Sequence, residues 1–196
     1  RERYGFTQGF EAWHEYWGSG DRMEQVPSSA QVTDNAIACL EAFFTEASDD
    51  PEGVSPFFLW AHFFDPHKLY IEHEGFPSYG RRSVDRYDGE IRFTDYHIGR
   101  LLEALEESGQ RENTVVVLTS DHGEAFGEHD MRNHGWDLYE HQIRVPLLVS
   151  VPGAVPADMQ TRVSLIDLAP TIVDLTGNIV PSAFRGVSLR TALASS

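Results

Sequence analysis

The sequence predicts an α/β fold with a mixed or mainly parallel sheet that is flanked by helices. Three apolar runs indicate strands, at 57–63, 114–120 and 145–151. Between them, apolar side chains recur at helical spacing. The run at 114–120 is apolar without alternation, as expected of a strand that is covered on both faces. The 196 residues are 41% hydrophobic, which is enough for the core of one domain or most of one.

The first half of the chain contains a leader, a helix, a strand and a loop. Residues 1–27 are aromatic, charged and glycine-containing without a clear period, so we expect a loop-rich leader. From 28 to 46, apolar positions repeat at helical spacing after a serine pair that is suited to capping. The strand at 57–63 follows. Residues 71–86 are polar and turn-rich, which predicts a surface loop.

The second half continues the alternation of helices and strands. An apolar stripe over 88–108 predicts an amphipathic helix, and Gly109 stands where a C-cap belongs. The two later strands follow, the first after a short connection. Ser164 and Asp167 have the spacing of a capping box, which predicts a helix that begins there and ends before Gly177.

The strongest chemical signal is the turn after the strand at 114–120. Asp121 and His122 follow this strand directly. In parallel α/β sheets, ligands bind beyond the carboxyl ends of the strands. A carboxylate beside an imidazole offers one hard and one borderline ligand to a divalent cation. Gly123 lets the backbone turn away without a Cβ clash. The alternative is that Asp121 only caps the next helix.

Five segments of the chain form a recognisable series of motifs. They are a strand ending in His-x-x-Asp-Pro-His (57–70), a helix (87–109), Ser-Asp-His-Gly-Glu (120–124), His-Gly to Arg-Val-Pro-Leu (134–147), and Ile-Asp-Leu-Ala-Pro-Thr within 164–177. In this order they resemble the sulfatase family of the alkaline phosphatase superfamily. The resemblance implies a partial alkaline-phosphatase-like fold. It also implies that residues 1–196 are the middle and C-terminal part of a sulfatase-like catalytic domain.

The segment that carries the nucleophile in this family has no counterpart here. In sulfatases a Cys or Ser in a Cys/Ser-x-Pro-x-Arg sequence becomes formylglycine, and no such sequence occurs in these residues. Cys39 lies in an apolar helical pattern and is expected to be a small core residue. Asp49 and Asp50 run into Pro51 and indicate a solvated loop, not the first metal aspartates of the family. We therefore expect this chain to be a fragment that is inactive alone.

The resemblance also assigns candidate site residues. Asp121 and His122 match the residues that bind the divalent cation. His67 matches a histidine that contacts the ester oxygens. His134 occupies the place of a lysine that holds the anion, and His67 or His134 would protonate the leaving alkoxide. His129 could be a second metal ligand, although a solvent-facing turn is favoured.

Three functions fit these residues. The first is metal-dependent hydrolysis of sulfate esters by the intact parent protein, with calcium as the favoured metal. The second is a phosphodiester, phosphonate or phosphomonoester hydrolase. An Asp-His pair at 121 and 122 favours this alternative, because imidazole suits zinc or manganese better than calcium. The third is a non-catalytic binding or scaffold protein that keeps the sulfatase-like fold.

Composition limits the partners. With 31 acidic and 15 basic residues, the net charge of −16 argues against nucleic acid and anionic membranes. The sequence contains no run of about eighteen apolar residues, so it predicts no membrane-spanning helix. The expected substrate is a small-molecule or carbohydrate sulfate ester, and exposed sheet edges make self-association possible. A single cysteine leaves the compartment open, and the resemblance favours the periplasm or the extracellular space.

Overall fold

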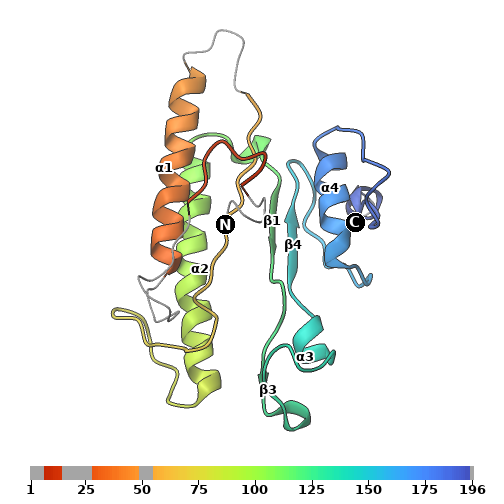
Figure 1. Cartoon of the computed structure of the whole chain (residues 1–196). Helices are drawn as coiled ribbons and strands as arrows, with labels where there is room; N and C mark the ends of the chain where they lie inside the picture. Colours follow the sequence, from red (N-terminus) through yellow and green to blue (C-terminus); the bar gives the residue numbers. More distant parts are fainter. Residues whose placement is uncertain (1–6, 15–27, 49–54, 195–196) are drawn as a thin grey trace. The chain divides into compact units, whose positions relative to one another are not determined.

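The computed structural model describes residues 7–14, 28–48 and 55–194. The chain divides into two compact units, 1–109 and 110–196 (Figure 1). Most of the expected leader lies outside the described residues, and so do Asp49 and Asp50. Within the described part, no helix is both long enough and apolar enough to span a membrane.

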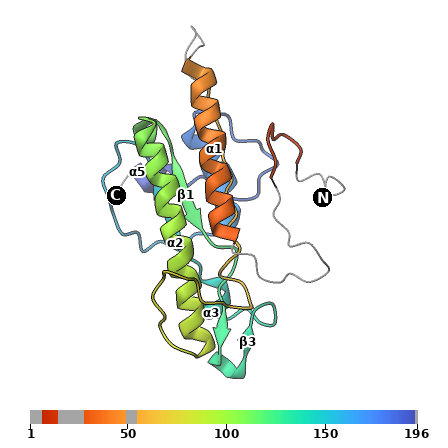
Figure 2. The same cartoon turned by 90° about the vertical axis from the view of Figure 1, so that its left-hand side faces the viewer.

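Two long helices pack side by side in the first unit (Figures 1 and 2). They are α1 (Ser28–Ser48) and α2 (Ser83–Glu107), and both confirm helices expected from the periodicity. Their contact includes polar links, because the Thr33 hydroxyl donates to the His97 carbonyl at 3.1 Å. The buried apolar side chains on the two helices are Ala36, Leu40, Phe93 and Leu105.

Helix α2 begins earlier than the apolar stripe suggested, at Ser83 instead of Asp88. The reason is local, since the Asp85 carboxylate accepts the Arg82 backbone N–H at 3.0 Å and also pairs with the Arg82 guanidinium. The hydrogen bond from the Arg82 guanidinium lowers the pKa of Asp85. The helix ends as predicted, with Gly109 in the left-handed region at φ +72°.

The expected strand at 57–63 is not formed in the described part of the chain. Residues 55–64 belong to no helix and no strand ladder. A strand requires a hydrogen-bonded neighbour, and the apolar pattern cannot supply one. The segment is held by side chains instead, because the Phe57 ring lies 5.6 Å from that of Phe43 and 5.5 Å from that of Phe44 on α1.

The second unit contains the other two predicted strands. They are β1 (Val116–Thr119) and β4 (Leu147–Ser150), which pair antiparallel with Val117 opposite Val149. The strands β2 (Ala125–Phe126) and β3 (Arg132–Asn133) form a second antiparallel pair. The α/β class is confirmed by helices and small sheets together. The sheet was expected to be mixed or mainly parallel, and the two strand pairs among the described residues are antiparallel.

Short helices complete this unit. They are η2 (Arg111–Asn113), η3 (Glu128–Asp130), α3 (Glu140–Ile143), η4 (Leu165–Asp167), α4 (Leu168–Leu175) and α5 (Arg190–Ala194). The predicted capping box is present at the start of η4, where the Asp167 carboxylate accepts the Ser164 N–H at 2.9 Å. The same carboxylate accepts the Val187 N–H at 2.8 Å. These backbone hydrogen bonds, with that from Val187 the largest, lower the pKa of Asp167.

Candidate active site

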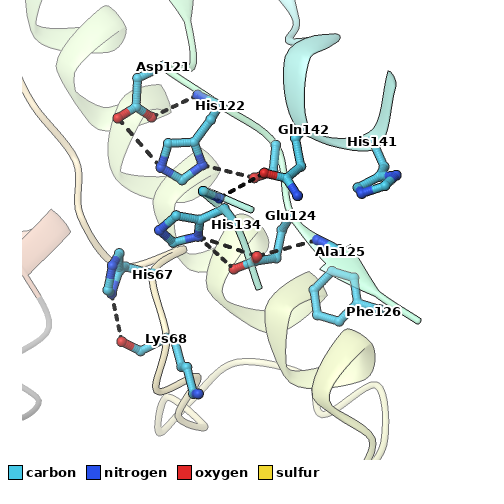
Figure 3. Close-up of polar contacts among 12 residues, drawn as sticks. His67, Lys68, Asp121, His122, Glu124, Ala125, Phe126, His134, His141 and Gln142 are labelled. Carbon is cyan, nitrogen blue, oxygen red and sulfur yellow. Dashed lines mark hydrogen bonds and ion pairs between the residues drawn. The ribbon is translucent and has the colours of Figure 1, made fainter. Parts of the chain in front are cut away.

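Two predicted metal ligands lie together just beyond the end of β1 (Figure 3). The His122 backbone N–H donates to Asp121 Oδ1 at 3.0 Å. The other carboxylate oxygen of Asp121 lies 3.7 Å from His122 Nε2. Both side chains are solvent-accessible, with Asp121 76% and His122 41% exposed. The pair therefore presents an oxygen and a nitrogen donor to the same open space.

A hydrogen bond sets the tautomer of His122. Its Nδ1 lies 2.8 Å from the Gly123 carbonyl oxygen, which only accepts. The neutral ring then carries its proton on Nδ1 and keeps the Nε2 lone pair, on the side of Asp121, for a ligand. Donors 3.7 Å apart can both reach one cation at the usual bond lengths of about 2.0 to 2.6 Å. The residues fit a divalent metal as two of its ligands.

A complete metal cage is not provided by the described residues. Among them, no group of three or more histidine, cysteine, aspartate or glutamate side chains is placed to hold a metal ion. Two protein ligands without further acids bind a cation weakly. To hold a cation tightly, the pair at the end of β1 would need further ligands.

Gly123 is required by close packing. A Cβ atom there would lie 2.2 Å from the His141 carbonyl oxygen, far inside van der Waals contact. The Gly123 N–H also donates to the Gln142 carbonyl at 2.7 Å, which ties the turn to α3. The sequence indicated a glycine that permits a turn, and the structure gives the close approach as the physical reason.

His134 joins this pair from the turn after β3. Its ring centroid lies 4.0 Å from that of His122, with an angle of 31° between the planes. The turn is tight, because Asn133 and Gly135 both have positive φ, at 64° and 86°. The Gly135 N–H donates to the Gln142 side-chain oxygen at 2.8 Å. The structure thus brings together three residues that are up to thirteen positions apart in the chain.

Glu124 is the site residue that sequence reasoning missed. Its side chain is 4% exposed, and both carboxylate oxygens lie 3.3 Å from His134 Nδ1 (Figure 3). Ala125 N–H donates to the same carboxylate at 3.3 Å. The available signal was the position of this acid, directly between Gly123 and the apolar residues Ala125 and Phe126. An acid next to apolar residues can be buried, and an ionised side chain is rarely buried without a partner.

His67 belongs to the first unit. Its Nδ1 lies 2.6 Å from the Lys68 carbonyl oxygen, and its ring stacks on Phe64 with centroids 4.5 Å apart. Because the carbonyl only accepts, this hydrogen bond places a proton on Nδ1 of His67. The predicted convergence of His67 with Asp121 and His122 involves both units and stays a prediction.

His129 lies in an exposed turn. Its φ is 51°, and its ring stacks on Tyr139 with centroids 3.9 Å apart. This agrees with the solvent-facing turn that the sequence favoured over a second metal ligand.

A wide groove of about 1690 Å³ opens beside the site within the second unit. Asp121, His122 and His134 line it, as do the guanidinium-bearing residues Arg144 and Arg162. Arginine is suited to bidentate binding of oxyanions. The groove therefore places two arginines near the candidate metal site, together with the acids Asp137, Glu140 and Asp158.

The fold matches the alkaline-phosphatase-like α/β class. A sulfatase crystal structure from Bacteroides fragilis aligns with 92% of this chain and 45% of its own, with a TM-score of 0.70 at 22% identity, which shows the fold. The family described as Sulfatase matches residues 2–179. The chain therefore belongs to the sulfatase family.

Closer sequence relatives match a shorter segment. An N-acetylglucosamine-6-O-sulfatase of Bacteroides thetaiotaomicron is 39% identical over 55% of this chain and 19% of its own length. An arylsulfatase of Clostridium perfringens is 34% identical over 56% of this chain and 24% of its own. A phosphonate monoester hydrolase from Silicibacter pomeroyi is 35% identical, with a TM-score of 0.54 over 58% of this chain and 22% of its own. The matched segments thus span about a fifth to a quarter of these relatives.

Proposed function

We propose that the intact protein containing this chain is a metal-dependent sulfatase, and that this chain alone has no turnover. The observation that carries the proposal is the convergence of Asp121, His122 and His134 beyond the end of β1. Sulfate ester hydrolysis is the activity of the family to which the chain belongs. Covalent catalysis needs an activated nucleophile, and these residues contain no Cys/Ser-x-Pro-x-Arg sequence.

In this proposal Asp121 and the Nε2 atom of His122 hold the divalent cation, with calcium favoured. A bound cation would polarise an ester oxygen and offset developing negative charge. The exposed carboxylate of Asp121 is the charged ligand, and the hydrogen bond from His122 Nδ1 to Gly123 keeps the imidazole oriented. Further ligands would come from residues outside this chain.

His134 and His67 act on the ester itself. Each has its Nδ1 engaged, His134 by Glu124 and His67 by the Lys68 carbonyl. In this proposal Nε2 of each ring contacts an ester oxygen, and a protonated imidazole there can donate its proton to the leaving alkoxide. In both histidines, Nδ1 thus orients the ring and Nε2 takes part in the chemistry.

We propose a small-molecule or carbohydrate sulfate ester as the substrate. The relative that is 39% identical is named for a sulfated N-acetylglucosamine, which supports the carbohydrate class. The two units are proposed to be parts of one catalytic domain, residues 1–196. The family resemblance also favours a periplasmic or extracellular protein. We propose self-association as well, because the sheets of the described residues have only two strands each.

A second candidate is a phosphonate or phosphate ester hydrolase that uses zinc or manganese. The Asp-His pair at 121 and 122 supports it, because imidazole is a better ligand for these metals than for calcium. The 35% identity to a phosphonate monoester hydrolase supports it as well.

The test is an assay of the intact protein against nitrophenyl sulfate, nitrophenyl phosphate and a phenylphosphonate ester, with calcium, manganese or zinc added. We expect sulfate ester turnover that falls more than about 100-fold in Asp121→Ala, since even outer partners of metal ligands are worth 10- to 100-fold. Glu112→Ala is the matched control, because Glu112 is an exposed acid of the same unit away from the groove.

Each alternative has its own outcome. Turnover of only the phosphorus esters would replace the proposal by the second candidate. An intact protein that binds metal but turns over none of the three esters would indicate a scaffold. Metal-dependent turnover by this chain alone, abolished in Asp121→Ala, would mean that a nucleophile within it has been overlooked.

A further inference from the structure

We propose that Glu124 is a positioning residue, whose buried carboxylate holds the His134 ring so that Nε2 faces the ester. This inference rests on the proposed function, in which His134 contacts the ester oxygens. It adds a residue that acts only through His134.

The geometry of the pair supports this role. Both Glu124 oxygens lie 3.3 Å from His134 Nδ1, so the acid faces the ring nitrogen symmetrically. A carboxylate only accepts, and Nδ1 must therefore carry the proton. Nε2 is the other nitrogen of the ring, and His134 lines the open groove.

The burial of Glu124 indicates that it serves a partner. Its side chain is 4% exposed, whereas that of His134 is 27% exposed. Removing an ionised carboxylate from water is costly unless hydrogen bonds and charge compensate it. The carboxylate accepts the N–H of its neighbour Ala125 and contacts His134 Nδ1 with both oxygens. A solvated acid with no positioning role would be expected at the surface.

An imidazole at this position needs orientation that a lysine would not. A lysine ammonium has three equivalent donors, whereas the two histidine nitrogens differ in role. A ring flip in His134 would put a carbon, Cδ2, where Nδ1 now faces Glu124, and would move Nε2 to the other side of the ring. The backbone on one side is fixed, because the Gly135 N–H donates to the buried Gln142 amide at 2.8 Å. Glu124 fixes the ring itself.

The first test is ¹⁵N NMR of histidine-labelled chain at pH about 9, where ordinary imidazoles are neutral. Wild type should show His134 as the Nδ1–H tautomer. Glu124→Gln should keep that tautomer, because the amide oxygen still accepts, and Glu124→Ala should lose it. The His122 signal is the internal control and should stay constant, because its Nδ1 is held by the Gly123 carbonyl.

Two results would overturn the proposal. One is a wild-type His134 that carries its proton on Nε2, which requires no variant and does not depend on how well Glu124→Ala folds. The other is a folded Glu124→Ala variant whose His134 tautomer equals that of wild type.

The second test separates this inference from the proposed function. In the intact protein, Glu124→Ala should lower kcat by about 10- to 100-fold, the range for partners that orient a functional histidine, with KM changed far less. Glu124→Gln should recover most of kcat. If wild type hydrolyses no sulfate ester, the proposed function fails while the tautomer result stands by itself. If wild type is active and Glu124→Ala matches it in kcat, the positioning role fails.

Discussion

Replacing Glu90 by alanine should destabilise the first unit by about 2–4 kcal/mol. The Glu90 side chain is 2% exposed, and its two oxygens accept the Ile71 N–H and His73 Nε2, each at 2.6 Å. Each buried donor left without an acceptor costs about 1–3 kcal/mol. Removing a buried carboxylate also relieves its desolvation, which offsets part of this loss. The His73 ring stacks on Phe93 at 3.6 Å and cannot turn to a new partner without losing that contact.

The measurement is urea unfolding followed by circular dichroism of the helices. Glu90→Gln keeps an acceptor of the same shape and should cost less than about 1 kcal/mol. Glu74→Gln, at an exposed acid of the same loop, is the matched control and should stay within about 0.5 kcal/mol of wild type. If Glu90→Ala is no less stable than this control, the two hydrogen bonds do not hold the loop to α2.

The same residue predicts a pH dependence. Burial raises the pKa of Glu90 above its ordinary value of 4.5, while the hydrogen bond with His73 opposes the rise and the charge of Asp65 adds to it. The folded state therefore holds the proton more tightly than the unfolded state. This contribution to stability is complete below about pH 4.5 and is lost as the pH rises through the raised pKa. The stability of wild type relative to Glu90→Gln should fall over that window.

Two further predictions concern the second unit and its turns. Gly123→Ala should cost about 1–3 kcal/mol of stability by overpacking against the His141 carbonyl. Gly99→Ala, in an open position of α2, should instead stabilise by roughly 0.5–1 kcal/mol. If the two variants have equal effects in thermal unfolding, Gly123 is not required by close packing against His141. Asp167 has a lowered pKa, so its contribution is present above the ordinary value of 3.8 and is lost as the pH falls through the folded value. In Asp167→Asn the free energy of unfolding should therefore fall less at acid pH than it does in wild type. An unchanged fall at acid pH would contradict this prediction.

The features that were predictable from the sequence are those encoded locally. The helical stripes gave α1 and α2, and the apolar runs gave β1 and β4, because burial periodicity is a property of neighbouring residues. The positions of Asp121 and His122 were predictable because they closely follow the strand β1. The segment at 57–63 shows the limit of this reasoning, since a strand depends on a partner that its own residues do not specify.

The features that were missed depend on contacts between distant residues or on strained backbone. Glu124 lies ten positions from His134, and nothing in either neighbourhood predicts that they meet. Positive φ occurs at His129 and Asp130 in η3, and at Asn133 directly before His134, and none of these residues is a glycine. Such conformations cost energy in isolation and persist because the surrounding contacts maintain them. Periodicity and composition contain no signal for them.

Electrostatics connects the metal pair with the histidines in the proposed function. The chain carries a net charge of −16, and its candidate site holds two carboxylates, those of Asp121 and Glu124. An anionic ester would be repelled by both acids unless positive charge compensates them. Glu124 is buried and contacts His134, so in our proposal its carboxylate orients the imidazole. The exposed Asp121 is then the acid that a divalent cation would have to neutralise. The cation in our proposal is therefore needed to admit the anion as well as to assist its hydrolysis.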